Sequence, residues 1–425
     1  MMMLVESYTA GRWHGPSGPR SSLLNASTSE RALALKRLAT HLNGMRDAFY
    51  AITSWTGATK RDALIDVDGG IGVLFTYASK GRPELPNTTV LLDGPTERLG
   101  RGGQFVGQYI YTPSRGIALQ INAFNFPVWG MLEKLARAFL AGVPTVVKPS
   151  LQTSYLAAAV VREMVDSAVL PAGSLQLVAG GSRRLLDLLT DQDTVAFTGS
   201  ASTAATSCWA SRRGPGRAGP GGGGEELDGI RSMLHYMQRT AVQGSPRSVS
   251  AVTGTWVTAA PRNLGAHPFR KSLAELRVGD AVEGGPRVVT LDDVNEFADL
   301  SGDQSYAHTH DEAASATTFF DSRVAHGYLV VALAAGLFVS PDPGPVLANY
   351  GLEHLRFVTP VYPGDALRVT LTAKSISPRA DADDGEVAWD ALVVNQREEL
   401  VATYDVLTTV AKSWPREVGT VKPTL

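Results

Sequence analysis

The sequence predicts an α/β domain built on a doubly wound parallel sheet, followed by a smaller α+β domain. Three observations support this order. Residues 116–200 alternate short apolar strands with helices, which is the pattern of parallel βαβ units. Residues 211–224 are mostly Arg, Gly and Pro, a composition that does not form a packed core. After residue 265, one helix is followed by several strands in which apolar positions alternate.

The first half opens with an amphipathic helix over Arg31–Tyr50. Its apolar residues recur at intervals of three and four and so share one face: Leu35, Leu38, Leu42, Met45 and Phe49. The βαβ part is predicted from buried strands and from helices that end at turn-forming residues. Its elements are strand Ile117–Ile121, helix Val128–Leu140 closed by Ala141-Gly142, strand Thr145–Val147, helix Ser154–Ser167 and strand Leu175–Val178.

The second half begins beyond a linker that contains four consecutive glycines, Gly221–Gly224. A short helix is predicted over Gly229–Thr240, and we place the domain boundary near Gly265. Thr290, with Asp293 three residues later, is typical of a capping box that opens a helix. A long apolar helix over Gly327–Val339 follows. The later strands present apolar faces, first Leu367, Val369 and Leu371, then Val387, Trp389, Ala391 and Val393.

Composition favours a cytoplasmic enzyme. The formal net charge of -2 gives no reason to expect nucleic acid or an anionic membrane as a partner. No apolar run is long enough to span a bilayer, and the start of the chain lacks the pattern of a signal peptide. Cys208 is the single cysteine, which excludes an internal disulfide framework and a cysteine-rich metal site. We expect no metal.

Asp303 and His308 form a candidate acid–base pair in a segment rich in turn formers. An acid and an imidazole near one water can polarise it and move its proton, as hydration of a carbon–carbon double bond requires. The N–H groups that open the following helix, at Gly327, could hold a thioester oxygen as it gains charge. The spacing alone is more typical of a local hydrogen-bonding pair. For His326 and His310 we favour structural roles, as a helix cap and a surface residue.

Three segments of the second half resemble the MaoC-like (R)-specific enoyl-CoA hydratases. They are residues 297–303 (FADLSGD) with His308, residues 324–328 (VAHGY) and residues 357–365 (FVTPVYPGD). The resemblance implies a hot-dog fold, in which a sheet wraps a central helix, and pairing into a homo-oligomer. It also implies an acyl-CoA thioester as substrate, Asp303 and His308 as catalytic residues and the Gly327 N–H as oxyanion donor, with no cofactor. One departure is Ala332, where many relatives carry serine.

The first half resembles the aldehyde dehydrogenase superfamily in residues 121–129 (INAFNFPVW), 147–150 (VKPS) and 195–200 (VAFTGS). The resemblance implies Asn125 as an oxyanion donor. It also implies that Lys148, Gly199 and Ser200 bind NADP or NAD. These enzymes need a cysteine nucleophile, but Cys208 stands beside the Gly/Pro segment, outside the nucleophile's usual context. We therefore expect the domain that carries the nucleophile to be missing and aldehyde oxidation to be lost.

Together the two halves resemble the PaaZ-type fusion proteins of phenylacetate degradation, with internal deletions in the dehydrogenase half. In those fusions the hydratase half opens a seven-membered oxepin-CoA ring and the dehydrogenase half oxidises the aldehyde. We thus divide the chain into a partial dehydrogenase domain (1–210), a linker with a dehydrogenase remnant (211–264) and a hydratase domain (265–425). Two alternatives stay open: the full bifunctional activity, and a non-catalytic protein that binds CoA thioesters or only oligomerises.

Overall fold

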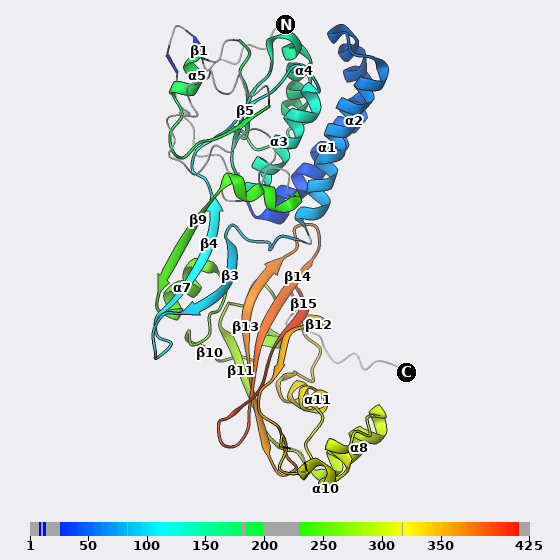
Figure 1. Cartoon of the computed structure of the whole chain (residues 1–425), viewed down its shortest axis with the longest axis vertical. Helices are drawn as coiled ribbons and strands as arrows, with labels where there is room; N and C mark the ends of the chain where they lie inside the picture. The colour runs from blue at the N-terminus through cyan, green and yellow to red at the C-terminus, as the bar shows by residue number, and fades with distance from the viewer. Residues whose placement is uncertain are drawn as a thin grey trace. The chain divides into compact units, whose positions relative to one another are not determined.

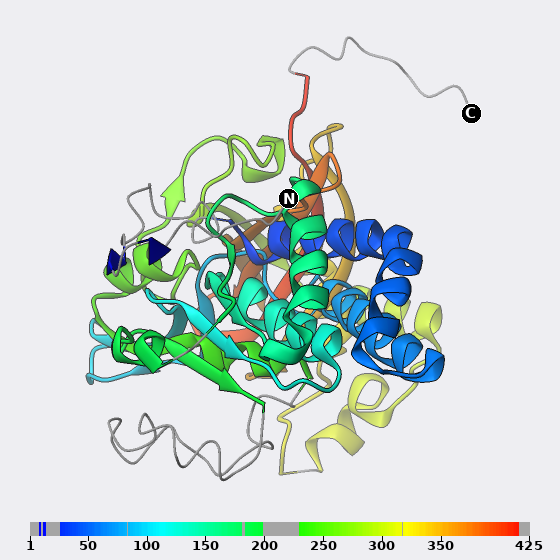
Figure 2. The same ribbon diagram turned by 90° about the horizontal axis from the view of Figure 1, so that it is seen from above.

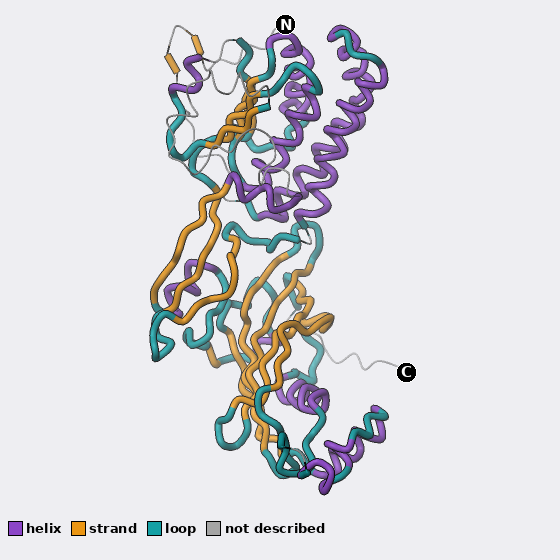
Figure 3. Tube along the Cα trace, viewed as in Figure 1, coloured by secondary structure: helices purple, strands orange, loops and turns teal. Residues whose placement is uncertain are grey.

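The computed structural model describes residues 26–82, 84–180, 183–198, 229–316 and 318–415, with the short strand pair β1 (Tyr8–Thr9) and β2 (Arg12–Trp13). The chain divides into two compact units, one of residues 1–95 and 109–241 and one of residues 96–108 and 242–425 (Figure 1). Helices dominate the first unit and strands the second, as Figure 3 shows. The domain boundary near Gly265 stays a prediction. Among the described residues, no helix is long and apolar enough to cross a bilayer.

The first unit contains a four-stranded parallel sheet of order β7-β6-β5-β8. The chain runs outward from β5 to β6 and β7 and then returns to the other side of β5. A parallel sheet with such a reversal is doubly wound, and its ligands bind where the strand order reverses. The predicted βαβ order is confirmed. The elements are β5 (Ala118–Ile121), α3 (Pro127–Ala141), β6 (Thr145–Lys148), α4 (Ser154–Asp166), β7 (Leu175–Leu177), α5 (Arg183–Asp187) and β8 (Thr194–Phe197).

Two long helices, α1 (Thr28–Thr53) and α2 (Lys60–Gly81), pack beside α3 (Figure 2). Helix α1 begins at a capping box and buries its predicted face, since Leu35, Leu38 and Leu42 are all 0% exposed. Helix α2 was not predicted. It approaches α3 closely because Gly69 lacks a side chain, and a Cβ there would lie 2.4 Å from the Trp129 ring.

Both ends of α3 are bonded by side chains from the other two helices. At its C-terminal end, the buried Arg31 of α1 donates from Nε to the Leu140 carbonyl at 2.7 Å. Burial lowers the pKa of Arg31 to about 10. At its N-terminal end, the buried Asp66 of α2 accepts from the N–H of Val128 at 3.1 Å and of Trp129 at 2.7 Å. These contacts satisfy backbone groups that a helix terminus leaves unpaired.

The helix predicted over Gly229–Thr240 is wrong in its second half. Residues Gly229–Tyr236 form a 3₁₀ helix, and β9 (Met237–Gly244) then joins a sheet of order β3-β4-β9 with β3 (Leu91–Arg98) and β4 (Val106–Pro113). Tyr236 and Met237 are buried where the 3₁₀ helix meets the strand. The β-branched Thr240 and Val242 suit a paired strand, and this pairing overrides a weak helical pattern.

The second unit is a six-stranded sheet of order β10-β11-β13-β14-β15-β12, which packs one face on the apolar helix α11 (Gly327–Phe338). The predicted strand faces are confirmed, because Leu371 and Trp389 are both 0% exposed. The capping box at Thr290 is also confirmed, at the start of α8. The remaining elements are α7 (Pro246–Thr253), β10 (Asn263–Leu264), β11 (Asp280–Val288), α8 (Leu291–Ser301), α9 (Tyr306–Thr309), α10 (Asp311–Ser315), β12 (Val346–Phe357), β13 (Ala366–Pro378), β14 (Asp384–Val394) and β15 (Leu400–Ala411).

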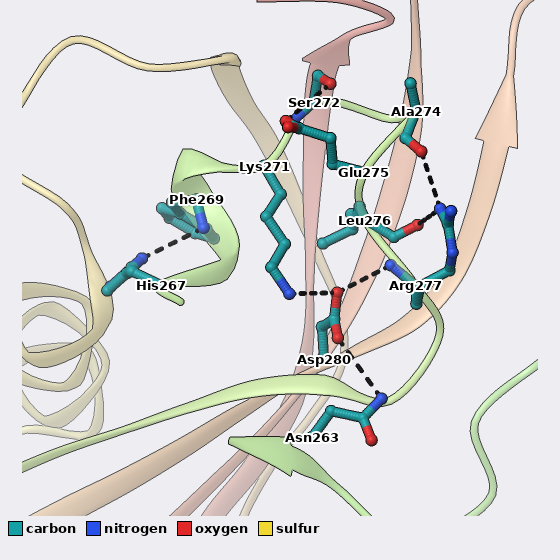
Figure 4. Close-up of polar contacts among 10 residues, drawn as sticks. All are labelled: Asn263, His267, Phe269, Lys271, Ser272, Ala274, Glu275, Leu276, Arg277 and Asp280. Carbon is teal, nitrogen blue, oxygen red and sulfur yellow. Dashed lines mark hydrogen bonds and ion pairs between the residues drawn. The ribbon is translucent and has the colours of Figure 1, made fainter. Parts of the chain in front are cut away.

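The segment that leads into the sheet is fixed by one buried carboxylate, Asp280, at the start of β11 (Figure 4). Its Oδ2 accepts from the Lys271 ammonium and from the Arg277 N–H, each at 2.9 Å. Its Oδ1 lies 3.5 Å from the Asn263 amide nitrogen. A buried carboxylate needs such partners. Here the partners come from β10 and from the loop between β10 and β11, so Asp280 holds this loop against the start of β11.

Candidate active site

Asp303 lies directly after the end of α8. The helix stops at Gly302, whose φ of 75° is a left-handed conformation that favours glycine. The chain then turns, and Asp303 comes to lie on an exposed loop before the short helix α9 that carries His308. Local bonds hold the Asp303 side chain and backbone: its N–H donates to Ser301 Oγ and its Oδ1 accepts from the Ser305 N–H, each at 3.2 Å.

The two ring nitrogens of His308 differ in their contacts, because a hydrogen bond to the backbone is formed by Nδ1. Its Nδ1 lies 2.7 Å from the Val324 carbonyl oxygen. Because a carbonyl oxygen only accepts, Nδ1 carries the hydrogen, and in the neutral ring Nε2 keeps a lone pair. A carboxylate oxygen of Asp303 and ring nitrogens of His308 and His326 all lie within 4.8 Å of one another. Polar groups more than about 3.5 Å apart can be joined by one water molecule.

His326 is the third member of this cluster. It is 2% exposed, its ring stacks on that of His308 with centroids 3.8 Å apart, and its Nε2 lies 3.0 Å from the Asp303 carbonyl oxygen. It is the N-cap residue of α11, as the sequence predicts, but its side chain makes no capping bond. Sequence reasoning missed its contact with both Asp303 and His308, although its position beside Gly327 was a usable signal.

Gly327 is the first residue of α11, so its N–H belongs to the turn that lacks intrahelical acceptors. The ring of Phe357 lies directly beside this position, because a Cβ on Gly327 would be 2.6 Å from two of its ring carbons. The structure thus brings the predicted residues Asp303, His308 and Gly327 into one region, with His326 in contact with the first two and next to the third.

The predicted residues of the first unit lie at the carboxyl edge of its parallel sheet. Lys148 ends β6, is 7% exposed and donates from Nζ to the Pro149 carbonyl at 2.7 Å; burial lowers its pKa. Asn125 is exposed in the turn between β5 and α3. Gly199, Ser200 and Cys208 lie outside the described residues.

Two polar residues at this edge were missed from the sequence. Asn122 follows β5, donates its N–H to the Lys148 carbonyl at 3.0 Å and buries a side-chain amide with no partner among the described residues. Lys134 is a buried lysine on α3 whose Nζ donates to Thr198 Oγ1 at 2.6 Å. A lysine on the apolar face of a predicted helix was a signal that could have found it.

A second acid–histidine group lies on the sheet of the other unit. Glu353, His354 and Asp405 have ligand atoms within 4.8 Å of one another. Asp405 already accepts from the Lys374 ammonium at 2.6 and 2.8 Å and lies 2.9 Å from His354 Nδ1. An ammonium bonded to both carboxylate oxygens disfavours a metal ion there, so this group is an ion-pair network.

Two family models match the chain. Residues 274–395 match the MaoC like domain, and residues 21–208 match the aldehyde dehydrogenase family. The second half is confirmed as a MaoC-like hot-dog domain and the first as aldehyde dehydrogenase-like.

Three relatives illustrate these matches. Protein MaoC of Klebsiella aerogenes is 49% identical over 179 residues, which cover 41% of this chain and 52% of that protein. The 3,4-dehydroadipyl-CoA semialdehyde dehydrogenase of Aromatoleum evansii is 44% identical over 177 residues, covering 41% and 34%. The (R)-specific enoyl-CoA hydratase of Rhodospirillum rubrum is 34% identical over 92 residues, covering 22% and 62%. The chain thus spans about half of the first relative and about a third of the second.

Proposed function

We propose that this chain, which joins an aldehyde dehydrogenase-like domain to a C-terminal MaoC-like domain, adds water to a carbon–carbon double bond. The residues that we assign to this hydration are Asp303, His308 and Gly327. The substrate is an unsaturated acyl-CoA thioester. The observation that carries the proposal is the grouping of a carboxylate, an imidazole with a free Nε2 lone pair and the start of α11. No cofactor takes part in this reaction.

The reaction needs one proton to leave water and one to reach carbon. His308 Nε2 accepts a proton from a water held by the Asp303 carboxylate, and the water oxygen bonds to the β-carbon. The electrons of the double bond move to the thioester oxygen, where the Gly327 N–H and the positive end of α11 stabilise the charge. The pair then returns a proton to the α-carbon, so that one water is added and the site is restored.

The particular substrate we propose is the seven-membered oxepin-CoA ring of phenylacetate degradation. Addition of water to its enol-ether carbon gives a hemiacetal that opens to an aldehyde still joined to CoA. This proposal is supported by the 3,4-dehydroadipyl-CoA semialdehyde dehydrogenase relative, whose name describes an aldehyde on a CoA thioester. We therefore expect the protein to open this ring and also to hydrate simple trans-2-enoyl-CoA substrates. We place both reactions in the cytoplasm.

A homo-oligomer formed through the hot-dog domain would cover apolar side chains beside the site. Tyr328 on α11 is 72% exposed, and Phe357 and Val358 near Gly327 are 48% and 56% exposed. Helix α11 is apolar on all sides yet leaves Tyr328 and Ala332 exposed, and Val339, directly after its end, is exposed as well. A helix of this composition is normally buried all round, which favours a second copy as the missing cover.

The described residues of the first unit fit part of a nicotinamide dinucleotide. Lys148 and the partnerless buried amide of Asn122 lie together at the carboxyl edge of β5 and β6, where donors and acceptors for ribose hydroxyls are needed. NADP or NAD, when bound, supplies a hydride acceptor. Aldehyde oxidation needs a cysteine thiolate. Because the described residues at this edge include no cysteine, we propose that cofactor binding is not followed by aldehyde oxidation.

The test measures hydration of trans-2-butenoyl-CoA and opening of oxepin-CoA by the full chain. Asp303→Asn and His308→Ala should each lower kcat by about a hundredfold or more, because each removes one partner of the acid–base pair. Asp292→Asn, at the opposite end of α8 from Asp303, and His310→Ala change exposed residues and should keep the activity. Wild-type rates in both site variants, with unchanged melting, would show that the site assignment is wrong; an inactive wild type favours the non-catalytic alternative.

A further inference from the structure

The environment of His326 does not fit a purely structural role. Its ring is held between His308, at 3.8 Å and an interplanar angle of 26°, and Phe297, whose centroid is 5.0 Å away. Its Nε2 donates to the Asp303 carbonyl, because a carbonyl oxygen only accepts. Its Nδ1 is buried without a hydrogen-bond partner in the described part of the chain. Such an unpaired nitrogen costs stability, and an apolar ring at this place would avoid that cost.

The same residue also sets the start of α11. With φ -59° and ψ 138° it is the last non-helical residue, and its carbonyl accepts the Val330 N–H at 3.1 Å. Gly327, the next residue, therefore begins the helix. His326 is joined by its ring to His308, by its Nε2–H to the backbone of Asp303 and by its peptide bond to Gly327.

We propose that His326 is a positioning residue, which fixes the Asp303 loop and the plane of the His308 ring at the spacing that one shared water requires. This inference rests on the proposed hydration at the same site. The loop needs such a contact because Asp303 is exposed and its other bonds are made to its near neighbours Ser301 and Ser305.

The two contacts of His326 can be removed separately in the full chain. His326→Phe keeps a ring for stacking but removes the Nε2–H, and His326→Gln keeps an N–H donor but removes the ring. The assay is hydration of trans-2-butenoyl-CoA with separate values of kcat and KM, and melting is followed by circular dichroism. His310→Gln, which changes an exposed histidine of the same segment, is the matched control.

We expect His326→Phe to melt at or above the wild-type temperature while its kcat falls tenfold to about a hundredfold, a size typical of a misplacement near 1 Å. KM should change by less than about threefold, because His326 itself does not hold the substrate in this scheme. His326→Gln should recover part of the lost kcat, since it restores the bond to the Asp303 carbonyl. The control should match the wild type.

Several outcomes would overturn the inference. One is a wild-type kcat in His326→Phe, and another is a loss that appears only in KM. Unfolding of both variants would also overturn it, because it would show that the imidazole is needed for stability. If Asp303→Asn and His308→Ala are inactive but His326→Phe is not, the positioning role alone fails. If the wild type hydrates no enoyl-CoA, the failure lies in the proposed function.

Discussion

The two units assemble their candidate sites in different ways. In the second unit Asp303, His308 and Gly327 lie within one short stretch of sequence, and bonds such as that from His308 to the Val324 carbonyl close it on itself. In the first unit the site depends on the ends of separate strands, where Asn122 meets the backbone of Lys148. A site made from one stretch stays complete as long as that stretch folds. A site made from the ends of several strands is complete only when every segment that contributes a strand is present and folded.

This difference predicts that the two halves would tolerate internal loss unequally. The aldehyde dehydrogenase match ends at residue 208, and the chain spans about a third of the semialdehyde dehydrogenase relative. Lys148 and Asn122 can keep their positions without a nucleophile, and in the function proposed above they would then serve binding alone. The four predictions below compare the two units, from the largest expected effect to the smallest.

The largest effect is the complete separation of the two activities. The full chain should hydrate enoyl-CoA but form no NADPH or NADH with a simple aldehyde, because oxidation requires a thiolate adduct. Cys208→Ala should change neither activity. The measurement is cofactor absorbance with an intact aldehyde dehydrogenase as positive control. Turnover that disappears in Cys208→Ala would restore the bifunctional alternative.

Removal of Arg31 should unfold the first unit selectively. Arg31→Ala leaves the Leu140 carbonyl and the Ala26 carbonyl without their buried donor, and it opens a cavity. The expected loss is about 3 kcal/mol of unfolding free energy. Hydrogen exchange of α1 and α3 should report it, while exchange of α11 stays unchanged. Arg37→Ala, on the exposed side of α1, is the control. An equal loss in α11 would show that the units unfold together.

Asp66 should make the first unit more stable at low pH. Burial raises its pKa from the ordinary 3.8 to about 6. The group therefore binds a proton on folding, so its contribution is fully present below pH 3.8 and is lost as pH rises through 6. Relative to Asp66→Asn, the wild type should lose on the order of 2 kcal/mol between pH 4 and pH 7. Hydrogen exchange of α2 and α3 measures this difference.

The control for this pH dependence is Asp62 of the same helix. Bonds from Thr59 lower its pKa, so its contribution is present above the unfolded pKa and is lost as pH falls. Asp62→Asn should therefore give a slope of the opposite sign. The same slope in both variants would contradict the assignment of the effect to Asp66.

The smallest effect is expected at Gly327. A methyl group there would meet the Phe357 ring at 2.6 Å, so Gly327→Ala should displace the start of α11 and lower kcat for hydration about tenfold. Gly336→Ala, in the same helix, meets no atom within 4 Å and should leave kcat unchanged while raising stability by about 0.5 kcal/mol. Equal rates in both variants would argue against a role for the Gly327 N–H.

The sequence predicted those features that depend on local patterns. These features depend on residues that are close together in the sequence. They are the apolar face of α1, the capping box at Thr290 and the strands around Trp389, and the structure confirms all three. Helix α2 was missed because its contacts with α3 depend on Gly69, which as a residue type disfavours helices. The strand β9 was missed because its partner β4 lies far away in sequence.

The candidate site follows the same rule. Asp303, His308 and Gly327 were identified from motifs within a short stretch, and they lie together in the structure. The stacking of His326 on His308, and the meeting of Asn122 with Lys148, depend on how segments fold back, which no spacing in one sequence reveals. The catalytic and cofactor roles of all these residues stay predictions.

The segment between His308 and Val324 is joined at its base by two bonds, from the Val324 N–H to the Ala307 carbonyl at 2.9 Å and from His308 Nδ1 to the Val324 carbonyl at 2.7 Å. Because these two bonds hold both ends of the segment, we expect a change in the length of its interior to leave the histidine in place. Doubling the length of such a loop costs only about 0.6 kcal/mol of closure entropy. Changes in the length of this stretch, where Phe319 is 80% exposed, should therefore leave the position of His308 unchanged.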